Sequence, residues 1–160
     1  VSGKVTEEIY DFFIQRLIIF LSDKYQKNVL EACAANKNPL TDLADYIKRV
    51  EAVSKLNSPA MLESANRVLR ILKEDSKKTV NKALFKEPAE SMLLSQIETV
   101  SENADYDKYL KQLEEINPSV EKFFNDVLVM DKDENVKENR LALLTLLKSK
   151  YAYLADFSKL

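Results

Sequence analysis

Apolar side chains recur at the 3.6-residue period of an α-helix along nearly the whole chain. No stretch alternates apolar and polar residues for long enough to predict a β-strand. At 160 residues, the chain can bury one core or pair two small bundles. The sequence therefore predicts an all-α fold, a helical bundle of about eight helices.

Prolines preceded by polar residues mark where several helices should begin. Asn38-Pro39, Ser58-Pro59 and Asn117-Pro118 each place a capping side chain before a proline at the first helical position. Glu87-Pro88 is a weaker form of the same signal. The predicted helices cover roughly residues 6–23, 27–36, 39–56, 59–74, 88–103, 106–116, 118–129 and 132–157.

Three further segments complete the predicted organisation. Asp131, followed by Glu134, is expected to cap the last helix. A short helical turn is expected around Leu84. The polar stretch 74–82 lacks periodicity, and it could separate sub-bundles at 1–74 and 83–160 of a single domain spanning 1–160. Because the first residue is Val1 and a helix follows almost at once, we expect a piece of a larger protein.

The residue types that are missing exclude most catalytic sites. The chain has no histidine, so it lacks the commonest general base and the commonest metal ligand. Its single glycine excludes a glycine-rich phosphate loop. The carboxylates of 131–134 lack the glycine and the ligand spacing of a calcium loop. We therefore expect neither a catalytic residue nor a metal site in this chain.

The remaining composition favours a cytoplasmic protein. A single cysteine, Cys33, excludes an internal disulfide and fits a reducing compartment. No stretch approaches the about 20 apolar residues of a membrane span, so no membrane partner is expected. The net charge is −2, but residues 1–86 carry 15 basic and 11 acidic side chains. A bound nucleic acid would therefore be attracted mainly by the first half of the chain.

The five arginines stand out against 19 lysines, since a planar guanidinium suits phosphates and unpaired bases. Arg67 and Arg70 point away from the apolar arc of their helix, beside Asn66 and Lys73. These four residues, extended by Lys77, Lys78 and Lys82, form the best predicted nucleic-acid surface. Pairs on the helix surface, Glu63 with Arg67 and Arg70 with Glu74, are an equal alternative.

Two other arginines fall inside apolar arcs. Arg16 lies in the middle of the arc of the first helix, and Arg140 lies within that of the last helix. A buried, unpaired charge is very costly, so each must meet a carboxylate or backbone carbonyls, or line a groove. A structural or groove-lining role is favoured for both.

Several motifs in order resemble one protein family. The specific part is Pro118–Met130, containing Phe123-Phe124, followed by Asn139-Arg-Leu-Ala-Leu-Leu144. Three segments precede it in the chain, namely Asp42–Val53, Ala65–Leu72 and Leu84–Glu90. One segment follows it, Leu154–Leu160. Together, over about residues 9–160, these segments resemble the C-terminal region of the bacterial glycyl-tRNA synthetase beta subunit.

The resemblance implies a helical anticodon-binding domain, similar to that of arginyl-tRNA synthetase. It implies binding of glycine tRNA through Arg67, Arg70, Asn66 and Lys73, with Arg49 a further candidate. It also implies that the remainder of the beta chain and an alpha subunit are partners in a hetero-oligomeric ligase. No cofactor is expected in this part, because ATP and magnesium belong to the alpha subunit. Where Asn66 and Arg70 stand, the family more often has lysine and asparagine. If that asparagine reads a base, either Arg70 reads it here or the contact is made elsewhere.

Two alternatives stay open. One is the homologous domain of an arginyl-type synthetase, which exchange of tRNA identity would distinguish. The other is a helical protein-interaction module that mediates subunit contacts. It predicts no RNA affinity and a patch of exposed apolar residues.

Overall fold

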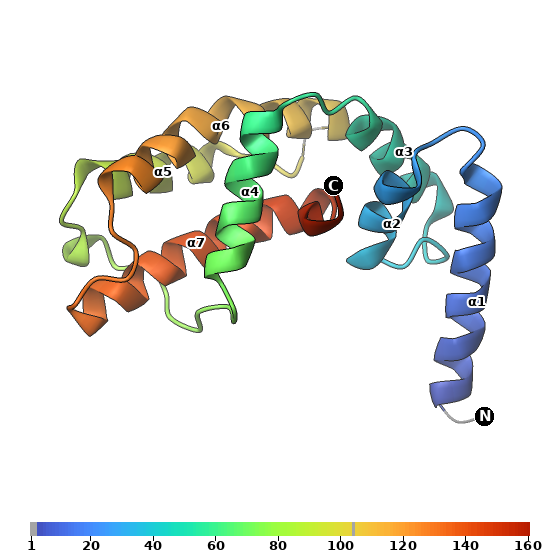
Figure 1. Ribbon diagram of the computed structural model, residues 1–160, viewed down its shortest axis with the longest axis horizontal. Coiled ribbons are helices and arrows are strands. Elements are labelled where there is room, and N and C mark those ends of the chain that lie inside the picture. The colour runs from blue at the N-terminus through green and yellow to red at the C-terminus, as the bar shows by residue number, and fades with distance from the viewer. Residues whose placement is uncertain (1–2, 104) are drawn as a thin grey trace.

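The computed structural model describes residues 3–103 and 105–160, and within them the fold is all-α without a strand (Figure 1). The prediction of an all-α fold is confirmed, with seven α-helices in place of about eight. Short 3-10 turns, η1 (Lys82–Leu84) and η2 (Phe157–Lys159), lie before α5 and after α7. The helices are α1 (Gly3–Leu21), α2 (Lys27–Ala35), α3 (Leu43–Ser54), α4 (Pro59–Ile71), α5 (Pro88–Thr99), α6 (Tyr106–Asp126) and α7 (Glu134–Leu154).

The count differs because Pro118 lies inside α6 and does not begin a helix. A proline inside a helix removes one backbone hydrogen bond and costs about 3 kcal/mol. Here the proline is on the exposed side, while the buried face runs unbroken from Tyr109 to Phe123. Burial of that apolar face on both sides of Pro118 offsets the local cost.

Apart from Pro118, the predicted helix starts are right in two places and wrong in two others. Ser58 caps α4 by accepting from the Met61 N–H, and the Glu87–Glu90 capping box opens α5. By contrast, Asn38 forms a local turn by accepting from the Leu40 N–H, and α3 begins only after Asp42. The last helix is capped by Asp133, two residues beyond the expected Asp131.

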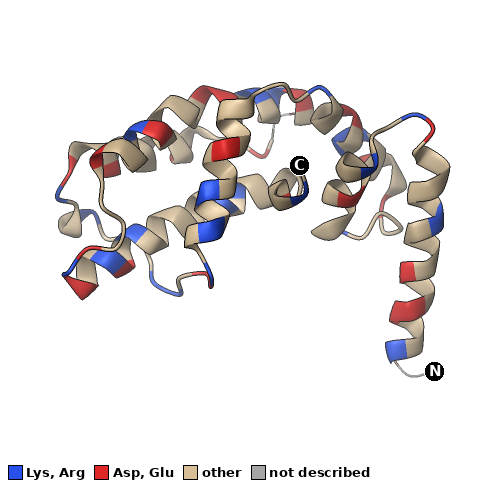
Figure 2. Ribbon diagram, in the orientation of Figure 1, with Lys and Arg blue, Asp and Glu red and all other residues tan. Residues whose placement is uncertain are grey.

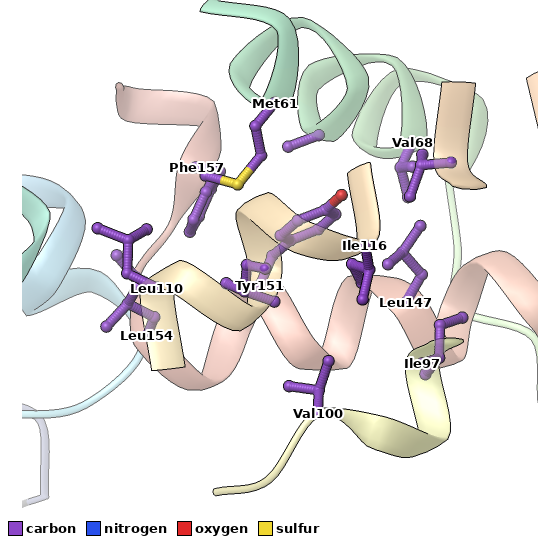
Figure 3. Packing of buried hydrophobic residues seen from close by; sticks show 14 of the residues in the cluster. Met61, Val68, Ile97, Val100, Leu110, Ile116, Leu147, Tyr151, Leu154 and Phe157 are labelled. Atoms are coloured by element: carbon purple, nitrogen blue, oxygen red, sulfur yellow. The ribbon is translucent and has the colours of Figure 1, made fainter. Parts of the chain in front are cut away.

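The molecule is elongated, with α6 and α7 running side by side and α4 crossing over both of them (Figure 1). The α2–α3 pair packs at one end of α6, and α5 packs on α6 and α7 towards the other. Side chains of α4, α6 and α7 meet at the centre (Figure 3). This central layer consists of Met61 and Val68 from α4, Leu110 and Ile116 from α6, and Leu147, Tyr151 and Leu154 from α7.

One buried cluster takes side chains from Ile18 to Phe157, on both sides of segment 72–81. The sub-bundles at 1–74 and 83–160 stay a prediction. Within the described residues, no helix is long and apolar enough to cross a membrane.

Candidate nucleic-acid interface

The outward face of α4 carries the residues predicted to meet a nucleic acid. Its inward face buries Met61, Ala65 and Val68, so the helical period turns Arg67 and Arg70 towards solvent. Both arginines are exposed, and neither forms an ion pair among the described residues. The alternative in which Glu63 pairs with Arg67, or Arg70 with Glu74, is therefore not realised here.

The other two predicted residues frame this face less directly. Asn66 is half-buried at the edge of the helix. Lys73 is exposed, but it lies beyond the helix, which ends at Ile71 and not at the predicted residue 74. Arg67, Arg70 and Lys73 thus form a basic surface that extends from α4 into the segment after it (Figure 2).

Arg67 lies against an aromatic ring from a distant part of the sequence. Its guanidinium carbon is 4.5 Å from the centre of the Phe124 ring at the end of α6. Phe124 is half-buried and packs against the core. A shallow hollow of about 250 Å³ surrounds this contact, lined by residues of α4 and α6 including Glu63 and Asn125. A guanidinium held over a ring by a cation–π contact is partly oriented before any ligand arrives.

The segment after α4 adds lysines to the same side of the molecule. Lys73, Lys77 and Lys78 line an open hollow of about 650 Å³ between this segment and the start of α7. None of the three forms an ion pair among the described residues. Figure 2 shows the basic positions of this segment beside those of α4, with acidic ones between them. The surface is therefore mixed, with basic groups in excess.

Three contacts hold this polar segment on α7. The Lys148 ammonium pairs with Asp75 at 2.6 Å, and the Ser76 N–H donates to Thr145 Oγ1 over 2.9 Å. Asn139 exchanges two hydrogen bonds with the backbone of Asn81, at 2.7 Å and 3.0 Å. The lysines are thus presented on an anchored segment.

Arg49 has a different environment from the other predicted contacts. It is only 1% exposed. Its Nε donates to Asp45, and its Nη1 donates to the carbonyl of Cys33 over 2.7 Å. A guanidinium enclosed in this way cannot touch RNA. Arg49 joins α3 to α2, and we remove it from the proposed surface.

The two arginines expected inside apolar arcs behave differently from each other. Arg140 is buried and donates to Glu90, to Asp131 and to the carbonyl of Leu128. Arg16 is exposed, because α1 turns its apolar arc outward, and its guanidinium lies 5.8 Å from the centre of the Phe12 ring. The structural or groove-lining role predicted for Arg16 stays a prediction.

Two acidic residues that the sequence analysis did not single out hold the buried arginines in place: Asp45 pairs with Arg49, and Glu90 pairs with Arg140. Asp45 accepts hydrogen bonds from Lys37, Arg49 and Tyr106. Burial alone would raise its pKa, but these three donors hold the pKa below the ordinary value. The i, i+4 spacing of Asp45 and Arg49 on one helix was the available signal.

Glu90 is the other missed residue. Its side chain is fully buried and accepts from Arg140 and from the N–H groups of Lys86 and Glu87. Burial acts to raise its pKa, and the Arg140 and backbone donors lower the pKa below the usual value. No cluster of potential metal ligands occurs in residues 3–103 and 105–160.

The all-α fold and the basic face of α4 suit recognition of a polyanion. The family model of the DALR anticodon binding domain matches residues 60–152, from the start of α4 almost to the end of α7. This chain belongs to that family.

More specific relatives extend the similarity over the whole chain. They are named glycine--tRNA ligase beta subunit. The relative from Geobacter sp. (strain M21) is 32% identical over 169 residues, which cover 99% of this chain and 24% of the relative. The relative from Thermodesulfovibrio yellowstonii is 33% identical over 180 residues, covering 100% of this chain and 25% of the relative. A relative from Shewanella sp. (strain ANA-3) is also 33% identical over 174 residues, which cover 99% of this chain and 25% of the relative.

The resemblance drawn from the Pro118–Met130 and Asn139–Leu144 motifs is thus confirmed. The chain spans about a quarter of the length of these curated relatives.

Proposed function

We propose that this chain is the anticodon-binding part of a glycine--tRNA ligase beta subunit and contacts glycine tRNA through the outward face of α4. The observation that supports this most is the position of the family match. It begins at residue 60, at the start of the helix that carries Arg67 and Arg70. The predicted basic surface therefore lies on a helix of the family's RNA-recognition domain.

The contact between Arg67 and Phe124 suggests how an unpaired base could bind. The guanidinium lies over the ring, and the Arg67 side chain is exposed. An unpaired base can stack on the guanidinium from the solvent side, and such stacking contributes about 1–3 kcal/mol. Arg70 would read a base edge or a phosphate beside it, with Asn66 supplying amide hydrogen bonds. Lys73, Lys77 and Lys78 would bind the backbone of the RNA.

In the whole ligase, this domain would position the tRNA and would not perform the chemistry. Holding the anticodon end fixes where the acceptor end lies, and orientation is a large share of a reaction rate. We propose that ATP and magnesium bind in the alpha subunit, and that the partners are glycine tRNA, the remainder of the beta chain and the alpha subunit. Such an enzyme would act in the cytoplasm.

A second function, as a subunit-contact module, is favoured by one observation. The exposed apolar side chains of α1, such as Phe20 at 77% exposure, form a patch of the kind that this alternative predicts. The patch lies on α1 and the basic surface on α4, so the two functions are compatible.

The test is a titration of the chain with glycine tRNA, with the same tRNA carrying a changed anticodon, and with arginine tRNA. Each is measured at two salt concentrations. We expect tighter binding to the native anticodon, weakened by Arg67→Ala by about 1–3 kcal/mol. The matched control is Lys27→Ala on α2, an exposed cation away from α4.

The outcomes separate the alternatives. Equal, salt-sensitive binding to all three tRNAs would reduce the role to backbone contact. Preference for arginine tRNA would favour an arginyl-type domain. Absence of binding to every tRNA, in this chain and in the full beta subunit alike, would leave the subunit-contact function.

A further inference from the structure

Helix α1 has two apolar faces, and the fold uses only one of them. Ile18 is buried, and Ile14, Leu17 and Leu21 pack beside it against the core. The opposite side of the helix carries a row of large apolar residues that are 44–77% exposed. This outward face of α1 consists of Val5, Ile9, Phe12, Phe13 and Phe20.

The outward face is a continuous patch, because its residues recur at helical spacing. They fall within one arc of the wheel, which also contains Arg16. Among the described elements, α1 packs mainly on α2 and projects from the body of the molecule (Figure 1). Contiguous apolar surfaces of this kind mark contact sites for protein or membrane.

The charges of the first half of α1 favour protein over a lipid surface. Glu8 lies at the edge of the arc, and Glu7 and Asp11 lie on the opposite, polar side of the helix, whereas helices that lie on anionic membranes carry lysine and arginine on their polar side. Arg16 is the single cation within the arc. When covered, it needs a carboxylate or backbone carbonyls opposite, because an unpaired buried charge is very costly.

The relatives indicate which protein surface covers the face. The DALR match begins at residue 60, so α1 lies outside the domain that the whole family shares. The similarity to the beta subunits nevertheless covers 99% of this chain, while about three quarters of each relative lies outside the match. The outward face of α1 is therefore shared with the beta subunits but lies outside the DALR domain. This position fits a contact with another part of the longer beta chain.

We propose that the outward face of α1 docks on the remainder of the beta chain, against an apolar surface that offers an acceptor to Arg16. This inference rests on the proposed function, because it takes the chain to be part of a beta subunit. Docking would fix the angle at which α4 meets the tRNA relative to the rest of the ligase.

Thiol labelling tests this contact at a single position. Cys33 gives little background, since it is buried and burial raises its pKa to about 12. The variant Phe20→Cys is made both in this chain and in the full beta subunit, and labelling is read by mass spectrometry at the peptide that carries position 20. Gln15→Cys, exposed on the polar side of α1, is the matched control.

We expect position 20 to react at least about tenfold more slowly in the full subunit than in this chain, with position 15 fast in both. Equal rates at position 20 in both would overturn the proposal. Slow labelling in this chain that speeds up on dilution would overturn it in favour of a second copy. Titration of Phe20→Cys with glycine tRNA reads the proposed function separately, because position 20 is remote from Arg67.

Discussion

The guanidinium of Arg140 on α7 donates from Nε to Oε1 of Glu90 on α5 over 2.9 Å, and the two side chains are 3% and 0% exposed. Both residues have further partners. Arg140 also meets Asp131 and the carbonyl of Leu128, and Glu90 also accepts from two backbone N–H groups. The pair therefore joins the start of α5, the loop before α7 and α7 itself at the end of the molecule away from α1.

Arg140→Met is expected to lower the free energy of unfolding by about 3–5 kcal/mol, because it leaves the carboxylate of Glu90 buried without its cation. Urea unfolding followed by circular dichroism measures the change. Lys122→Ala, which removes an exposed pair with Asp126, is the control and should cost less than about 1 kcal/mol. A loss of similar size in both variants would contradict the structural role of Arg140.

Acid should weaken the fold through Glu90. The pKa of this carboxyl is lowered from 4.5 in the folded state, because Arg140 and two N–H groups outweigh the effect of burial. A depressed folded pKa adds stability that is fully present above about pH 4.5 and is lost as the pH falls through the folded pKa. The free energy of unfolding, measured from pH 7 downward, should therefore decrease once the pH is below about 4.5.

Glu90→Gln separates this effect from the titration of other carboxylates. The variant should be less stable than the parent at pH 7, and its stability should fall less steeply as the pH drops. Parallel pH profiles for the two proteins would show that Glu90 does not contribute to acid sensitivity.

The buried tyrosines should respond unequally to loss of their hydroxyl groups. Tyr109 donates to the carbonyl of Lys150 over 2.6 Å, whereas the hydroxyl of Tyr151 has no partner among the described residues. Tyr109→Phe should cost about 1 kcal/mol, and Tyr151→Phe should be neutral or stabilising. Thermal unfolding of both variants checks the difference. A larger loss for Tyr151→Phe would show that its hydroxyl is paired in solution.

The sequence predicted the helical class and most element positions because capping and periodicity are local signals. It located α4 and its outward arginines, since Met61, Ala65 and Val68 define one buried stripe. It could not find the contact of Arg67 with Phe124, because 57 positions in sequence separate these residues and only the packing of α4 on α6 joins them.

The same limit applies to two of the arginines. An apolar arc on α1 has the pattern of a core-facing helix, and only the position of its neighbours shows that the arc faces outward. Arg49 has a polar partner at i−4, as surface arginines do, yet carbonyl groups from α2 and α7 enclose it. Sequence periodicity gives the direction of a side chain relative to its own helix, but not what lies opposite.

Lysines of the segment after α4 should contribute affinity for RNA without sequence preference. Lys77 and Lys78 are exposed on a segment anchored to α7, so they can neutralise phosphates but have no defined orientation towards a base. The double substitution of both by alanine should weaken binding of native and anticodon-changed glycine tRNA by the same factor. It should also reduce the slope of log affinity against log salt by about 2. Fluorescence titration over a range of salt concentrations measures both quantities, with Lys27→Ala as the control. A change in preference between the two tRNAs would instead place these lysines beside the bases.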